Sequence, residues 1–124
     1  MRTWVILVSF SLALAIFSIG ENHVMNKFYS EIDSVIYDIR DDLSNNRSPA
    51  SEVEKLNNIW KSTKVWAYIY SSHESFDDYE ECINDIQEYL KLDVMPLIYY
   101  KTLHLENTNN HLKESLIFKA ENIF

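Results

Sequence analysis

An uninterrupted apolar segment opens the sequence. Residues 3–20, TWVILVSFSLALAIFSIG, carry no charged side chain, and as a helix they would be about 27 Å long, close to the hydrocarbon thickness of a bilayer. Arg2 precedes this segment and Glu21 follows it, so the positive-inside rule places the N-terminus in the cytoplasm. We therefore expect residues 1–20 to form a single-pass anchor in the cell membrane and residues 21–124 to form an acidic extracytoplasmic domain.

Two other interpretations of the opening segment stay open. Ser18 and Gly20 are small residues at the positions that a signal peptidase requires, so cleavage after Gly20 would release a secreted, soluble protein. The length of the segment and its minimal basic n-region favour the uncleaved anchor. A buried core helix is the third interpretation, but the rest of the chain offers little that could surround so continuous an apolar cylinder.

The composition favours helices and argues against several functional classes. A single glycine and two prolines among 124 residues leave few turn residues for a sheet-rich fold. The formal net charge of -8 disfavours nucleic acid as a partner, and a single cysteine excludes an internal disulfide scaffold. The sequence shows no nucleophile elbow, glycine-rich phosphate loop or zinc-ribbon spacing. We therefore expect a non-enzymatic protein without a cofactor.

Apolar residues recur at helical spacing beyond Gly20. The first stretch runs from Met25 to Leu43 in steps of mostly three or four residues, and nothing between Glu21 and Leu43 interrupts a helix. This amphipathic stalk would continue the membrane helix and turn its apolar stripe either toward its own bundle or toward a second copy. A polar connection, SNNRSP at residues 44–49, then precedes further helical stretches. The fold we expect is all-α: an N-terminal transmembrane helix that continues into a small antiparallel bundle of three to four helices.

Local signals mark the starts of the later helices. They are the capping box of Ser51 and Glu54, the pair Ser75 and Asp78, and Asp93 as a cap ahead of Pro96. The last helix carries Ile98, Leu105 and Leu112 at seven-residue intervals. The ENTNN stretch at residues 106–110 makes its second half a weaker prediction. The apolar tail from Leu116 onward is expected to dock onto the bundle.

One sequence comes near a metal-binding motif. His73 and Asp77 form H-E-x-x-D, which differs from the zincin pattern H-E-x-x-H at its last position and lacks a third ligand. If Ser75 caps a helix, His73 precedes that helix and does not share a face with Asp77. We therefore expect no metal and a structural role for His73 at a corner between helices. Cys82 lies beside the apolar stripe, and we expect it to be a small buried core residue.

A set of residues spread over most of the chain follows a known order. Two tryptophans on one helix lead to a histidine and an acidic helix start, then to a helix ending in Tyr-Leu and a terminal Glu-Asn-Ile-Phe. The positions concerned are Trp60, Trp66, His73, Asp77, Glu80, Tyr89, Leu90, Glu121, Asn122, Ile123 and Phe124. In these features the chain resembles the DUF4363 family of small bacterial proteins, although Ser75 stands where the family pattern has glutamate.

The resemblance carries limited implications for function. It implies a membrane-anchored helical protein of the bacterial cell envelope, in a family without an established activity. It also singles out structural or interaction positions, which are Trp60, Trp66, His73, Asp77, Glu80 and Asn122.

These lines converge on a non-enzymatic interaction or structural module. We expect residues 3–20 to bind the membrane, and the amphipathic helices to bind a protein partner or to self-associate. The alternatives are a secreted helical binding protein released by cleavage after Gly20, and a metal-binding protein that uses His73 with nearby carboxylates.

Overall fold

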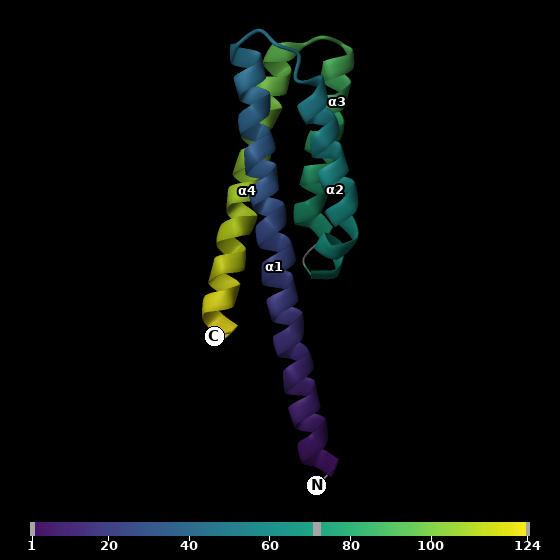
Figure 1. The fold of residues 1–124 in the computed structure, drawn as a ribbon, viewed down its shortest axis with the longest axis vertical. Coiled ribbons are helices and arrows are strands. Elements are labelled where there is room, and N and C mark those ends of the chain that lie inside the picture. The colour runs from purple at the N-terminus through teal and green to yellow at the C-terminus, as the bar shows by residue number, and fades with distance from the viewer. Residues whose placement is uncertain (1, 71–72, 124) are drawn as a thin grey trace.

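The computed structural model of the chain is an all-α bundle (Figure 1). It describes the backbone of residues 2–70 and 73–123, and the side chains of these residues apart from 73–75 and 118–123. The described residues form four helices, which are α1 (Arg2–Ser44), α2 (Ala50–Tyr70), α3 (His73–Lys91) and α4 (Met95–Ile123). No strand occurs in this part of the chain, so the predicted fold class is confirmed.

The helices pack in chain order around a ring. α1 contacts α2 and α4, and α3 contacts the same two neighbours, while successive helices run antiparallel (Figure 1), as short connections favour. The N-terminal part of α1 projects alone beyond the other three helices (Figure 1). We call the end of the bundle farthest from this projection the distal end. The end of α2, the start of α3 and the end of α4 lie at the opposite, proximal end.

The second half of α1 supplies one wall of the core. Met25, Phe28, Ile32, Val35 and Ile39 recur every three or four residues, and each is at most 1% exposed. Such spacing keeps one helix face turned toward its neighbours. The apolar stripe of the stalk therefore faces its own bundle, so it offers no surface to a second copy.

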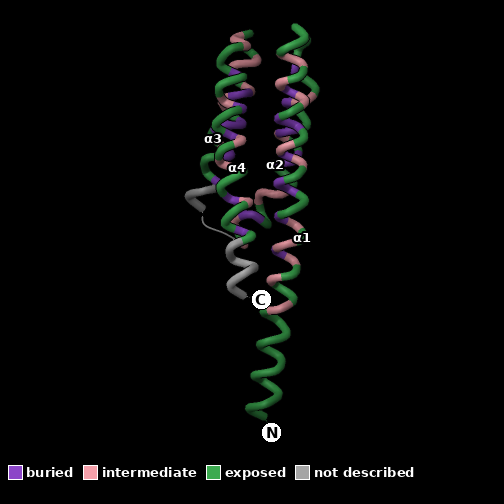
Figure 2. Tube along the Cα trace, turned by 90° about the vertical axis from the view of Figure 1, so that its left-hand side faces the viewer, coloured by how far each residue is buried: buried purple, intermediate pink, exposed green. Residues whose placement is uncertain are grey.

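Most of the first half of α1 has no described residue of another helix packed around it. Figure 2 shows exposed positions along most of this half, with buried positions concentrated in the bundle. The 18-residue segment that could cross a membrane by length and composition has none of its residues buried. Trp4 is 74% exposed and Phe10 63% exposed. The interpretation of this segment as an interior core helix is therefore wrong, because the bundle ends before it can cover these side chains.

α1 ends in a Schellman motif at the distal end. The N–H of Arg47 donates to the carbonyl of Asp42 at 2.8 Å, and the N–H of Asn46 donates to the carbonyl of Leu43 at 3.3 Å. Asn46 has a φ of 57°, the left-handed conformation that this motif requires. Asparagine tolerates this conformation better than most residues because its side chain is short and polar.

α3 ends in the same way, and this corrects the role predicted for Asp93. Asp93 has a φ of 57°, the N–H of Val94 donates to the carbonyl of Tyr89 at 3.0 Å, and the N–H of Asp93 donates to the carbonyl of Leu90 at 3.2 Å. Asp93 therefore terminates α3, whereas Val94 accepts the first hydrogen bond of α4, from Ile98. Aspartate suits both a cap and a left-handed position, and the sequence does not distinguish them.

The other two start signals are also displaced. α2 begins at Ala50, whose N–H donates to Ser48 Oγ at 3.3 Å, so Ser51 lies inside the helix and forms no capping box. α3 begins at His73, two residues before the predicted cap Ser75. Serine and acidic residues are frequent around both starts, so several registers satisfy the same pattern.

Candidate functional site

Trp60 lies at the centre of the core. It is 2% exposed, and its ring stacks on Tyr79 and Phe76 with centroid distances of 5.6 and 6.2 Å. Phe28 of α1 closes the cluster at 6.0 Å from Trp60. Aromatic side chains bury large areas and add stacking energy, so Trp60 joins α1, α2 and α3. Among the described residues, none is a hydrogen-bond partner of its Nε1 atom.

Asp77 and Glu80 pair with α2. The Tyr68 hydroxyl donates to Asp77 Oδ1 at 3.0 Å, and Lys64 Nζ forms an ion pair with Glu80. Burial, followed by the hydrogen bond to Asp77, raises the pKa of Tyr68 to about 12. Both acidic residues thus hold α3 against α2 from the solvent side, which fits a structural role.

The remaining predicted positions lie at the proximal end. Trp66 is 49% exposed, and its ring stacks on Tyr70 at 6.2 Å. His73 is the first residue of α3, so it shares a helix with Asp77 instead of preceding that helix. Asn122 belongs to the last turn of α4. The side chains of His73 and Asn122 lie outside the described part of the structure.

A buried polar cluster joins three helices in the middle of the bundle. Asn109 of α4 is fully buried, and its Oδ1 accepts a hydrogen bond from the Tyr79 hydroxyl at 2.6 Å. Its Nδ2 donates to the Tyr29 carbonyl at 3.0 Å and to Asp33 Oδ1 at 2.7 Å. Lys113 Nζ then pairs with Asp33 Oδ2 at 2.5 Å. Both amide hydrogens of Asn109 are thereby used, as burial of a polar side chain requires.

The buried polar cluster joins helices and is not suited to catalysis. Burial raises the pKa of Tyr79 far above its ordinary value, with smaller contributions from Tyr29 and Asp33. The Tyr79 hydroxyl therefore stays protonated and donates to Asn109, so it is a poor base or nucleophile at neutral pH. The arrangement specifies how α1, α3 and α4 align.

The sequence did contain a signal for this cluster. Ile98, Leu105 and Leu112 mark the core stripe of α4, and Thr102 and Asn109 fall between them at steps of three and four residues. Both polar residues are fully buried. A polar residue at a core position of a helical stripe predicts a buried hydrogen bond.

Arg40 forms a second polar junction between α1 and α4. Its Nε donates to Thr102 Oγ1 at 3.3 Å, and its Nη1 forms an ion pair with Glu106. The guanidinium carbon lies 5.8 Å from the centroid of the Tyr99 ring, within the range of a cation–π contact. The Nη2 atom is buried and has no hydrogen-bond partner in the part of the chain that the structure describes.

A pocket of about 640 Å³ opens at the distal end beside Arg40. Its lining includes Leu43 of α1, Arg47 of the first connection, and Met95, Pro96 and Tyr99 of α4. This volume falls within the range of small-molecule sites.

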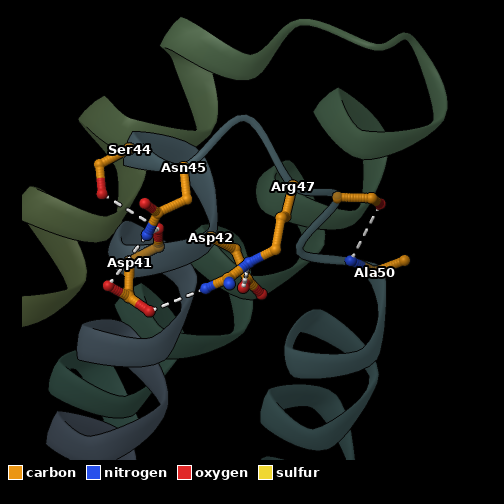
Figure 3. A network of polar contacts seen from close by, with 7 residues as sticks. Asp41, Asp42, Ser44, Asn45, Arg47 and Ala50 are labelled. Carbon is orange, nitrogen blue, oxygen red and sulfur yellow. Dashed lines mark hydrogen bonds and ion pairs between the residues drawn. The ribbon is translucent and has the colours of Figure 1, made fainter.

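The distal connection holds Arg47 in place beside this pocket. Figure 3 shows the Arg47 side chain reaching back to Asp41 and Asp42, with N–O distances of 2.9 and 3.1 Å. Asn45 Nδ2 donates to the Asp41 carbonyl at 2.8 Å. Arg47 is thus committed to carboxylates of its own chain, as Arg40 is to Glu106, so neither is a free anion ligand.

Five exposed apolar side chains lie just after α3 and in the first turns of α4, and one of them, Tyr99, lines the pocket. They are Leu92, Leu97, Tyr99, Tyr100 and Leu103, with exposures from 37% for Leu103 to 67% for Tyr100. We call these five residues the distal apolar set. Tyrosine and leucine left exposed near a pocket are features of protein-binding surfaces.

The single cysteine of the chain is shielded from solvent. Cys82 is 1% exposed, as predicted, and burial raises the pKa of its thiol to about 11, so it carries little thiolate at neutral pH. Among the described side chains, no group of three or more histidine, cysteine, aspartate or glutamate residues lies close enough to hold a metal ion.

Comparison with known proteins adds one match. The model of a family described as "Domain of unknown function (DUF4363)" matches residues 19–123, which include the whole bundle and the last two residues of the apolar segment. No curated protein and no solved structure shows significant similarity to the chain.

Proposed function

The chain belongs to the DUF4363 family, and from this premise and the geometry above we propose that it is a membrane-anchored, non-enzymatic interaction protein of the bacterial cell envelope. One observation carries the proposal. The uncovered apolar segment and the core helix of the bundle are a single unbroken helix, α1. If the apolar segment spans the membrane, the bundle is held at the membrane surface, because the same helix α1 forms part of its core.

The packing at the base of the bundle favours the anchor over a cleaved signal. Phe17 and Gly20, which cleavage after Gly20 would remove, both contact Tyr70 of α2. The Phe17 and Tyr70 ring centroids are 4.8 Å apart, and a Cβ placed on Gly20 would lie 3.0 Å from the Tyr70 hydroxyl. Cleavage would therefore remove contacts through which α2 packs against α1.

The anchor is tested by the fate of the native product. The full chain is expressed in bacteria, membranes are extracted with alkaline carbonate, and the mass of the protein is measured. We expect an intact chain in the extracted membrane pellet. A soluble product that begins at Glu21 would instead establish the secreted form.

The orientation is tested by labelling from outside the cell. The connection at the distal end is exposed, so Asn45→Cys in a Cys82→Ala background provides one accessible thiol. Arg2 before the span and the acidic bundle after it favour an extracytoplasmic bundle. We expect a membrane-impermeant maleimide to label intact cells. Labelling only after lysis would reverse the orientation.

The distal apolar set is the surface proposed to bind the protein partner, which is either another envelope protein or a second copy. A photocrosslinking residue replaces Tyr100 in cells, and the same residue at Tyr37, which is 70% exposed on α1, is the matched control. A discrete crosslinked product from position 100 and none from position 37 supports the proposal, and its mass distinguishes a second copy from another protein. Equal products at both positions, or none at either, would contradict it.

A further inference from the structure

Large exposed apolar side chains on α2 are confined to its proximal end. Val65, Trp66 and Ile69 are 65%, 49% and 55% exposed. Ile69 follows Val65 by four residues and Trp66 by three, so the three side chains share one side of the helix. After Ala50 at the start of the helix, the exposed residues of the earlier turns of α2 are polar, namely Ser51, Glu54, Lys55, Asn58, Lys61 and Ser62. The outer surface of α2 thus changes from polar to apolar within its last turns.

This change occurs at the depth where the apolar segment of α1 ends. Tyr70, at the end of α2, contacts Phe17 and Gly20, with a centroid distance of 4.8 Å between the two rings. Phe17 lies about 5 Å along the helix axis from Gly20, where the uncharged segment stops. If that segment fills the hydrocarbon layer, Tyr70 lies at the boundary between acyl chains and headgroups.

Aromatic rings connect the two helices at this level. The Trp66 ring stacks on the Tyr70 ring at 6.2 Å with an interplanar angle of 21°, and Tyr70 contacts Phe17 in turn. Tryptophan and tyrosine are enriched at membrane–water interfaces because their rings are apolar with one polar group. Val65 and Ile69 flank Trp66 with side chains that water does not solvate well.

We propose that the proximal end of α2 inserts Val65, Trp66 and Ile69 into the interfacial layer of the same bilayer that α1 spans. The inference rests on the proposed membrane anchorage and adds a second attachment. α1 alone would leave the bundle free to tilt about one helix, whereas two attachment points on neighbouring helices fix its inclination to the membrane. The net charge of -8 favours zwitterionic over anionic lipid as the partner.

Three tryptophans make the test direct, because the chain contains only Trp4, Trp60 and Trp66. The full-length protein is reconstituted into phosphatidylcholine vesicles in three forms, each of which keeps one tryptophan and carries phenylalanine at the other two positions. Lipids brominated near the top of the acyl chain quench fluorescence only at short range. Trp4 reports on the anchor, Trp66 on the proposed contact, and Trp60, which is buried in the core, is the negative control.

We expect brominated lipid to quench Trp4 and Trp66 and to leave Trp60 unchanged. Quenching of Trp4 without Trp66 would overturn the inference and leave the anchor intact, whereas absence of quenching at Trp4 would overturn the anchor itself. Protection of Trp66 from both brominated lipid and aqueous acrylamide would show that protein covers it, which also overturns the inference.

A second measurement covers the case in which loss of Trp60 prevents folding. Ile69→Cys in a Cys82→Ala background, with all tryptophans retained, carries a nitroxide label, and Asn58→Cys is the matched control on the polar part of α2. We expect the label at position 69 to be more accessible to oxygen than to a water-soluble nickel complex, and the label at position 58 to show the reverse. Equal preference for the nickel complex at both positions would overturn the inference.

Discussion

The side-chain amide of Asn109 lies 2.7 Å from the Asp33 carboxylate, although 76 residues separate them in the chain. The oxygen of the same amide accepts a hydrogen bond from the Tyr79 hydroxyl at 2.6 Å. A single buried polar residue thus ties α4 to both α1 and α3. Any shift of α4 by one turn would leave these groups buried without partners, at a cost of about 1–3 kcal/mol for each. The cluster therefore selects one alignment of helices whose apolar stripes alone would permit several.

The first prediction concerns Asn109→Leu. Leucine has a similar volume, but it cannot accept a hydrogen bond from the Tyr79 hydroxyl or donate one to the Tyr29 carbonyl. We therefore expect the free energy of unfolding to fall by about 1–3 kcal/mol. Replacing Tyr79 by phenylalanine as well removes one unsatisfied group, so the double variant should lose less than the sum of the two single changes. The free energies of unfolding of the two single variants and the double variant are measured by circular dichroism on the full chain in detergent. Simple additivity would contradict the proposed coupling.

The second prediction concerns alkaline pH. Burial raises the pKa of both Tyr29 and Tyr79 above their ordinary value of 10.0. In the unfolded chain these tyrosines ionise first, so their contribution to stability is complete below about pH 10 and declines as the pH rises above it. We expect the melting temperature to fall as the pH rises from about 10 to about 11.5. Tyr79→Phe should flatten this fall, whereas Tyr37→Phe, at a side chain 70% exposed, should not.

The third prediction concerns the end of α3. Asp93 has a φ of 57°, a conformation that costs a residue with a Cβ about 1 kcal/mol or more. Asp93→Gly removes this cost but loosens the unfolded chain, so we expect a net gain of about 0.5 kcal/mol. Asp93→Val should lose about 1 kcal/mol or more, because β-branched residues fit this conformation worst. Thermal unfolding of the two variants should therefore shift in opposite directions, and equal shifts would exclude the Schellman geometry.

The sequence predicted the long-range plan of this fold better than its local details. The apolar stripe that begins at Met25 and the uncharged segment before it are signals repeated over many residues. The stripe is confirmed as a core face, and the uncharged segment is confirmed as a helix long and apolar enough to cross a membrane. Helix ends depend on one or two residues and on free energies of about 1 kcal/mol, and Ser51 and Asp93 each satisfied a start pattern that the chain does not use.

The candidate positions show a similar division. Trp60, Asp77 and Glu80 all lie where α2 packs against α3, and their structural role stays a prediction. The distal pocket and its Arg40 junction arise from helices that are distant in sequence, so no local pattern could reveal them. Asn109 was within reach of prediction, because its place in the core stripe of α4 is readable from Leu105 and Leu112. Its partners Asp33 and Tyr79 were not, since they depend on how the helices align.

The last prediction concerns the packing of α2 against α1 at Gly20. Alanine in place of a helical glycine stabilises a helix by about 1 kcal/mol, but a Cβ on Gly20 would lie 3.0 Å from the Tyr70 hydroxyl. Gly20→Ala should therefore gain less in the natural chain than in a Tyr70→Phe background, where the hydroxyl is absent. A double-mutant cycle on thermal unfolding in detergent gives this difference as a coupling free energy. The pair should couple by about 0.5 kcal/mol or more, and a coupling near zero would mean that Tyr70 does not contact Gly20.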